Sequence, residues 1–191
     1  ETTKDPRVFY RLLIDNKVTV LNQTPSSFRN LITISEKESQ KIDSLRYVIF
    51  GGEKLNYSVL VPWVNQYGIE SPRLINMYGI TETTVHATWK KITEVDLINN
   101  SLSPIGSALP DITLDIVDEF GKSLPVGKEG EIYISGDGLS RGYLNRPDLT
   151  NERFVFRSNK SGIYERWYHS GDIGVQTGLN EFAYIGRADD Q

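Results

Sequence analysis

The sequence predicts an α/β fold over about residues 1–90, followed by an α+β region over about residues 91–191. In the first stretch, short apolar runs alternate with segments whose apolar residues recur at helical spacing. This alternation is typical of helices and strands arranged around a mostly parallel sheet. In the second stretch, short alternating segments lie between glycine turns, which predicts an antiparallel sheet or a small distorted barrel.

The first stretch opens with a predicted helix, in which Val8, Leu12 and Leu13 form an apolar stripe. Residues 18–21 are an apolar run that predicts a buried strand, and Pro25 begins the next predicted helix. Two further strands are predicted within residues 47–53 and 73–79. Between them lies a predicted helix over residues 56–68, which Gly68 closes.

The second stretch begins with a polar segment, residues 93–103, which predicts a loop. The predicted strands fall in three segments, residues 111–138, 168–176 and 181–187. Residues 118–122, with the sequence DEFGK, predict the loop of a hairpin. Residues 130–150 are glycine-rich and are interpreted as strand, turn and loop.

Composition excludes several functional classes. Hydrophobic residues make up 38% and charged residues 24%, which is ordinary for a globular protein. The net charge is −4 and there is no long basic block, so neither nucleic acid nor a membrane surface is an expected partner. The chain has no cysteine, which rules out disulfides and thiolate metal sites and agrees with the predicted cytoplasmic location. The two histidines, His86 and His169, are far apart, which argues against a histidine-rich metal site.

Small polar residues and glycines follow each predicted parallel strand, at residues 21–25, 50–54 and 76–82. Ligands of such sheets bind beyond the carboxyl ends of the strands, so these segments predict one site. Residues 76–89 mix apolar side chains with hydroxyls, a carboxylate and an imidazole, as the lining of a ligand cavity does. A plain strand-to-loop turn with surface threonines is the commoner reading of this stretch alone.

Four residues suggest nucleotide chemistry. The Thr81 hydroxyl suits phosphate oxygens, and the Glu82 carboxylate suits Mg²⁺. Asp172, between two glycines, suits the two hydroxyls of a ribose, and Arg187 suits phosphate. Read singly, Asp172 is a turn residue and Arg187 part of a solvated charge cluster.

The order of five motifs is more specific than any one of them. The segments VTVLNQTPSSF, NMYGITETT, GEIYISGDGLSRGYL, YHSGDIG and GRADDQ occur in this order along the chain. Together they resemble the adenylation domains of nonribosomal peptide synthetases, within the adenylate-forming superfamily. The resemblance implies that residues 1–90 are the second half of the α/β subdomain of the adenylation core. It implies that residues 91–191 are the β-rich subdomain that ends at the hinge to a further C-terminal domain.

The resemblance also implies a reaction and its nucleotide site. An amino acid is activated with ATP as aminoacyl-AMP, with Mg²⁺, and is then loaded onto the phosphopantetheine thiol of a carrier domain. Thr81, Glu82 and Arg187 would act directly in the first step, with Glu82 as the metal ligand. Asp189 would be the hinge. The residues implied to bind the nucleotide are Gly52, Glu53, Asn76, Tyr78, Asp172, Tyr184 and Arg187.

Six positions match those that meet the substrate side chain in this family, and together they resemble the pocket of threonine-activating domains. They are Asn22, Ile49, Gly51, Met77, Val85 and His86. Asn22 and His86 suit a buried hydroxyl, and the apolar members suit a methyl group. The sequence departs from the family at Ile80, where proline is usual, and at His169 and Ser170, where a basic residue and threonine are common.

The resemblance sets limits as well. The family's phosphate loop, its α-ammonium aspartate and its catalytic lysine match nothing in this sequence, so the fragment by itself is expected to be inactive. The expected partners are the amino acid and the carrier and condensation domains of the same synthetase. Two alternatives stay open: a noncatalytic nucleotide-binding or scaffold remnant, and an acyl- or aryl-activating ligase of the same superfamily.

Overall fold

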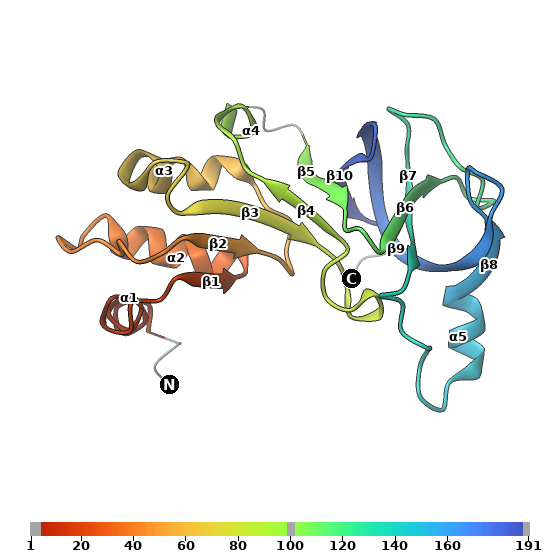
Figure 1. Ribbon diagram of the computed structural model, residues 1–191, viewed down its shortest axis with the longest axis horizontal. Helices are drawn as coiled ribbons and strands as arrows, with labels where there is room; N and C mark the ends of the chain where they lie inside the picture. The colour runs from red at the N-terminus through yellow and green to blue at the C-terminus, as the bar shows by residue number, and fades with distance from the viewer. Residues whose placement is uncertain (1–4, 99–101, 189–191) are drawn as a thin grey trace. The chain divides into compact units, whose positions relative to one another are not determined.

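The computed structural model of this chain describes residues 5–98 and 102–188 (Figure 1). It divides into two compact units, each built from two stretches of chain. Unit 1 comprises Glu1–Asn76 and Lys91–Ser101, and unit 2 comprises Met77–Lys90 and Leu102–Gln191. The two units are described separately below.

Unit 1 contains the predicted parallel sheet. Strand β1 (Val20–Gln23) pairs with β2 (Tyr47–Phe50), which pairs with β3 (Arg73–Tyr78), all in parallel. The first strand starts at Val20, two residues later than the apolar run predicted. The carboxyl ends of the three strands therefore lie at one edge of the sheet, as the sequence predicted.

Unit 1 also contains short helices. They are α1 (Pro6–Asp15), α2 (Pro25–Ser35), the 3₁₀ turn η1 (Tyr57–Leu60), α3 (Val61–Tyr67) and α4 (Glu94–Ile98). Helix α4 lies inside the segment that the sequence predicted as a loop. None of the helices in the described ranges is long and apolar enough to cross a membrane.

The start of α2 is fixed by three residues. Thr24 caps the helix by accepting the backbone N–H of Ser27 at 3.3 Å, and Pro25 occupies the first turn. The Glu53 carboxylate accepts the backbone N–H and the hydroxyl of Ser26, at 3.0 and 2.7 Å. A carboxylate at this position is favoured by the positive end of the helix dipole.

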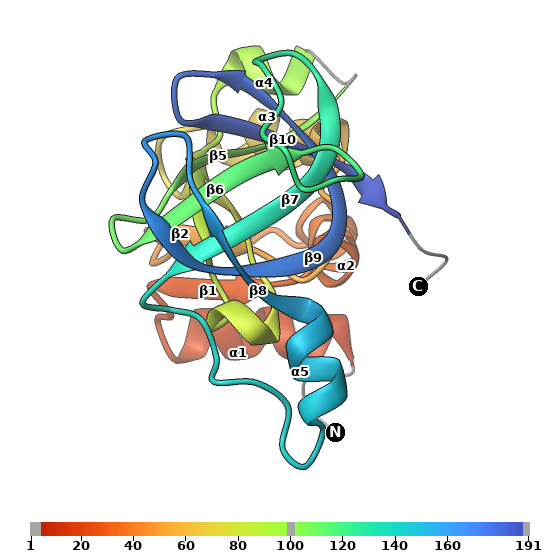
Figure 2. The ribbon, with the colours of Figure 1, turned by 90° about the vertical axis from the view of Figure 1, so that its right-hand side faces the viewer.

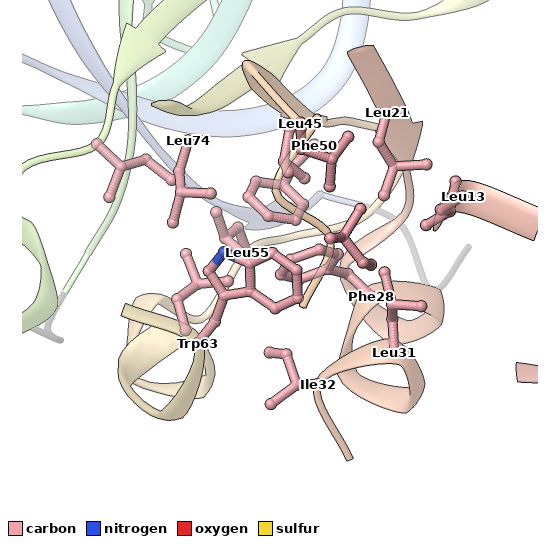
Figure 3. Packing of buried hydrophobic residues seen from close by; sticks show 14 of the residues in the cluster. Leu13, Leu21, Phe28, Leu31, Ile32, Leu45, Phe50, Leu55, Trp63 and Leu74 are labelled. Atoms are coloured by element: carbon pink, nitrogen blue, oxygen red, sulfur yellow. The ribbon is translucent and has the colours of Figure 1, made fainter. Parts of the chain in front are cut away.

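The core of unit 1 is aromatic at its centre (Figure 3). Phe28 of α2 contacts Phe50 of β2 edge-on, with ring centroids 5.0 Å apart, and Trp63 of α3 at 4.7 Å. Trp63 also stacks on Tyr67 at 4.1 Å. Edge-to-face and offset contacts of this kind are the favoured geometries of aromatic rings, so α2 and α3 are anchored by directional as well as hydrophobic contacts.

Unit 2 is an antiparallel sheet with the pairing order β4-β5-β10-β9-β7-β6, and β8 pairs with β9 (Figure 2). The strands are β4 (Thr88–Lys91), β5 (Ser103–Ala108), β6 (Ile112–Val117), β7 (Glu129–Gly136), β8 (Phe154–Ser158), β9 (Tyr164–Gly178) and β10 (Glu181–Arg187). This order is an open path. Of the two predicted forms, the antiparallel sheet is confirmed and a closed barrel is not formed.

Two features of unit 2 differ from the sequence prediction. Helix α5 (Pro147–Arg153) begins within the segment interpreted as strand, turn and loop, extends three residues beyond it, and leads directly into β8. Its two turns are too short to produce a clear helical repeat. The predicted turn at residues 118–122 exists, since the Asp118 N–H donates to the carbonyl of Lys122. After this turn the chain forms an isolated bridge between Val117 and Ser123. The strand that pairs with β6 is β7, which begins at Glu129.

Candidate functional site

A bulge in β9 builds the centre of the site. Residues 170–172 lie opposite Ile132 of β7 alone, because the register between β7 and β9 shifts between Glu131 and Tyr133. The Ser170 hydroxyl donates to the carbonyl of Ile132 at 2.6 Å, which fastens the bulge to β7. Bulges redirect side chains locally, and this one carries Asp172.

Asp172 is buried, and two side chains from other elements of unit 2 donate to its carboxylate. The Tyr78 hydroxyl donates to Oδ2 at 2.7 Å, and Arg187 Nη1 lies 3.2 Å from Oδ1. Arg187 pairs with Asp172 across β10 and β9, so the ion pair follows from the strand register. Burial, with the charge of Asp172, raises the pKa of Tyr78 well above its ordinary value, which keeps the phenol a donor. The Tyr184 ring lies 5.9 Å from the Tyr78 ring.

A second polar cluster surrounds Glu82, which lies on the short 3₁₀ turn η2 (Thr81–Thr83). The Tyr143 hydroxyl donates to Glu82 Oε1 at 2.6 Å. The Tyr168 hydroxyl lies 3.1 Å from the Tyr143 hydroxyl. Three segments far apart in the sequence therefore meet at one carboxylate.

A cavity of about 550 Å³ lies beside this cluster, wholly within unit 2. Its lining combines one carboxylate, two guanidinium groups, several hydroxyls and two apolar side chains. The lining residues are Ile80, Thr81, Glu82, Tyr143, Leu149, Arg153, Tyr168, Ser170 and Arg187. Two cationic groups in a hollow with hydroxyl donors suit an anion such as phosphate.

The loop after β3 is held in an unusual backbone conformation. Thr84 and Val85 have φ values of +57° and +74°, which are rare for non-glycine residues and rarest for a β-branched one. The His86 N–H donates to the carbonyl of Thr84 at 2.9 Å, so Val85 is the centre of a γ-turn with positive φ. Backbone strain of this kind gathers at functional sites.

His86 follows this turn and is half-buried. Burial lowers the pKa of its imidazole, which favours the neutral ring. Its Nδ1 atom is buried, and none of the residues that the structure describes forms a hydrogen bond with it. Such an atom costs free energy unless something bonds it, so a polar group of a ligand is a natural partner.

Unit 1 holds the predicted residues that precede Met77, and Met77 itself belongs to unit 2. Asn22 of β1 is paired in register with Ile49 of β2, and Gly51 and Gly52 follow that strand. Asn76 is buried, and its amide donates to the Tyr57 hydroxyl at 3.0 Å. The Glu53 carboxylate points to the start of α2, where the hydrogen bond from the Ser26 hydroxyl is the main cause of a lowered pKa.

Within unit 2 the structure brings the predicted nucleotide residues close together. Thr81, Glu82 and Arg187 line one cavity, and Tyr78, Asp172 and Tyr184 form the cluster beside Arg187. Asp189 lies outside the described residues. No group of three or more histidine, aspartate or glutamate side chains that could hold a metal occurs among residues 5–98 and 102–188. A cation here would need phosphate oxygens as further ligands.

The sequence interpretation missed four members of this cavity, namely Tyr143, Leu149, Arg153 and Tyr168. Tyr143 is 61 positions from Glu82 along the chain, so no local pattern connects them. The only signal of Tyr143 and Tyr168 was their membership of the motifs RGYL and YHSGD, which served to mark the resemblance. Leu149 and Arg153 lie outside the five motifs and had no such signal.

Comparison with known proteins adds three findings. The family model described as AMP-binding enzyme matches residues 1–144. Malpinin synthetase of Mortierella alpina is 43% identical over 191 residues, which are 100% of this chain and 2% of that protein. Syringomycin synthase SyrB1 of Pseudomonas syringae pv. syringae is 40% identical over 191 residues, which are 100% of this chain and 30% of that protein. The chain thus spans a small part of these relatives.

A solved structure agrees with the fold. The structure described as PA1221, an NRPS protein containing adenylation and PCP domains, superposes with a TM-score of 0.87 and 28% identity. The match covers 98% of this chain and 37% of that one.

Proposed function

This chain belongs to the AMP-binding enzyme family, and we propose that it forms part of an amino-acid adenylation domain of a nonribosomal peptide synthetase. The observation that carries the proposal is the cavity of unit 2. It joins Thr81, Glu82 and Arg187, with Asp172 and Tyr78 beside them. Hydroxyl, carboxylate and guanidinium groups in this arrangement suit a nucleoside phosphate and its cation.

In the proposed first step, a carboxylate oxygen of the amino acid attacks the α-phosphorus of ATP. The bond between that phosphorus and the oxygen bridging to the β-phosphate breaks, and pyrophosphate leaves. Transfer at phosphorus depends mainly on positioning and charge neutralisation. Thr81 and Arg187 would hold the phosphate, and Asp172 would accept the ribose hydroxyls, with Tyr184 nearby. Tyr78, Asn76, Gly52 and Glu53 would contact the base.

The chain's own residues fit Mg²⁺ at Glu82. Mg²⁺ commonly binds one or two carboxylates together with substrate phosphates, and Glu82 offers one carboxylate at the wall of the cavity. When bound, the cation would neutralise the charge of the phosphate oxygens. In the proposed second step, the phosphopantetheine thiol of a carrier domain attacks the acyl carbon, and AMP leaves.

We propose threonine as the amino acid. Support comes from the residue types at Asn22, Ile49, Gly51, Met77, Val85 and His86. The unpartnered Nδ1 of His86 is the structural observation in favour, because a substrate hydroxyl would satisfy it. A site that bonds a hydroxyl disfavours valine, which would leave the polar group unpaired.

The test is amino-acid-dependent exchange between ATP and labelled pyrophosphate, measured on the full-length protein with threonine, serine, valine and no amino acid. We expect the fastest exchange with threonine. Replacing His86 by alanine should reduce the preference for threonine over valine by about tenfold, the loss expected for one buried hydrogen bond. Asn22→Ala should act in the same direction.

Each other outcome has a defined meaning. Exchange that is fastest with another amino acid would keep the adenylation proposal and overturn the threonine assignment. Exchange with an acyl or aryl acid alone would move the protein to another branch of the family. Nucleotide binding without exchange would identify a noncatalytic member.

A further inference from the structure

Tyr143 is hydrogen-bonded to Glu82, the one carboxylate among the described residues that line the cavity. Its hydroxyl donates to Glu82 Oε1 at 2.6 Å, which is in the short range of charge-assisted hydrogen bonds. The Tyr143 hydroxyl proton is donated to Glu82. In the hydrogen bond between the two phenols, 3.1 Å long, the Tyr168 hydroxyl is therefore the donor and the Tyr143 oxygen the acceptor. The result is a directed chain from Tyr168 to Tyr143 to Glu82.

Both phenols are fixed in place by packing. The Phe154 ring lies 4.8 Å from the Tyr168 ring and 5.9 Å from the Tyr143 ring. The Arg166 guanidinium lies over the same Phe154 ring, 4.1 Å from its centroid. Arg166 also donates to the backbone carbonyls of Ser140 and Arg141, at 2.7 and 2.8 Å, which anchors the loop that carries Tyr143.

The same loop is joined directly to the turn that carries Glu82. The Ser140 N–H donates to the backbone carbonyl of Glu82 at 2.8 Å. The Thr84 hydroxyl donates to the carbonyl of Gly138 at 2.7 Å. Backbone and side chain of Glu82 are therefore both held by residues 138–143.

Burial raises the pKa of Tyr143 and of Tyr168 above the ordinary phenol value. Both side chains consequently remain protonated donors at neutral pH. The direction of the hydrogen-bond chain does not change over the range in which the protein would work.

We propose that Tyr143 is a positioning residue for the metal ligand Glu82. It occupies Oε1 and leaves Oε2 for a divalent cation that accompanies a nucleotide polyphosphate. Tyr168 acts through Tyr143 and also interacts with Glu82 itself. This inference rests on the proposed function, because it assumes that Glu82 receives the cation of bound ATP.

The experiment measures binding of Mn²⁺ in the presence of excess ATP to the full-length protein, by electron paramagnetic resonance, with Mn²⁺ as the probe. Free ATP affinity is measured separately with EDTA. We expect Tyr143→Phe to weaken Mn²⁺ binding by about tenfold, the effect of losing one hydrogen bond to a charged group, and to leave metal-free ATP binding unchanged. Tyr168→Phe should have a smaller effect in the same direction.

Tyr164→Phe is the matched control, because its side chain is exposed on the first residue of β9. It should leave Mn²⁺ binding unchanged. In a Glu82→Gln background, Tyr143→Phe should have no further effect on Mn²⁺ binding, since residues that act through one another are not additive.

The outcomes separate this inference from the proposed function. Wild-type binding of Mn²⁺ with ATP that is weakened by Glu82→Gln but not by Tyr143→Phe would overturn the positioning role alone. Weaker thermal stability of Tyr143→Phe at unchanged Mn²⁺ affinity would show a purely structural role and would also overturn it. A wild-type protein that binds no Mn²⁺ with ATP would overturn both proposals.

Discussion

At the scale of single residues, Asp172 shows how this protein keeps a buried charge. A buried carboxylate without partners is costly, and its removal from water is offset only by good hydrogen bonds. Asp172 has a phenol and a guanidinium as donors, and the Ser170 hydroxyl accepts its backbone N–H at 3.0 Å. The same interactions hold the carboxylate beside the cavity at the proposed ribose contact.

His169, which directly precedes Ser170 on β9, gives the protein an acid-sensitive group. Burial lowers the pKa of its imidazole, with Arg153 and Arg157 adding to the effect and Glu152 opposing it. The unfolded chain, in which the pKa is near its ordinary value of about 6.5, binds the proton more readily. The free energy of unfolding should therefore fall as the pH drops through this range.

We expect His169→Gln to reduce this loss of stability between pH 7 and pH 5, measured by urea unfolding at several pH values. Because glutamine does not titrate in this range, proton binding at position 169 no longer changes the free energy of unfolding of the variant. His86, whose pKa is also lowered by burial, retains its own contribution in both proteins. An unchanged pH slope in the variant would contradict the prediction.

At the scale of elements, the loop after β3 depends on close backbone packing at Gly79. A Cβ atom there would lie 2.3 Å from the Val85 carbonyl oxygen and 2.7 Å from the Ala87 nitrogen. The Ala87 N–H also donates to the Tyr78 carbonyl at 2.7 Å, so these backbones cannot separate without losing a hydrogen bond. Only glycine permits this approach, which in turn holds the γ-turn at Val85.

Gly79→Ala should therefore destabilise the protein by about 1–3 kcal/mol, the range for overpacking, as measured by denaturant unfolding. The matched control is Gly186→Ala in β10, where a Cβ would meet no atom of the described part of the chain within 4 Å. That variant should change stability by less than about 0.5 kcal/mol. Equal effects of the two substitutions on stability would contradict the prediction, because they would mean that the loop shifts to make room for the Cβ atom with little loss of stability.

At the scale of the whole molecule, each unit has a core of its own. The core of unit 1 includes Ile42 and Trp63, and unit 2 buries Ile132 and Trp167. All four side chains are at most 1% exposed. Each unit thus contains a deeply buried tryptophan that can report its unfolding by fluorescence.

We expect Ile42→Val to shift the unfolding reported by Trp63 more than that reported by Trp167, and Ile132→Val to do the reverse. Each substitution should cost about 0.5–1.5 kcal/mol. Single-tryptophan variants that keep only Trp63 or only Trp167 make the measurement. Coincident shifts in both reporters would show that the chain unfolds as one cooperative body.

The sequence by itself determined the family and the local elements of unit 1 other than α4. Helical and strand periodicity, Pro25 and Gly68 place α2, α3 and the parallel strands, because these signals arise from neighbours in the chain. The order of five motifs identified the resemblance, and the family is confirmed. The roles assigned to the site residues and the division at residue 90 remain predictions.

Only the tertiary structure decided which side chains meet. The bulge at residues 170–172, the ion pair of Asp172 with Arg187, and the contact of Tyr143 with Glu82 join positions separated by 15 to 61 residues. The tertiary structure also showed that the β-rich half is an open sheet, since closure depends on which strands pair. Periodicity carries information over a few residues, whereas strand register and packing set these distances across the fold. That is why residue types could suggest a chemistry for the site, while its geometry came only from the fold.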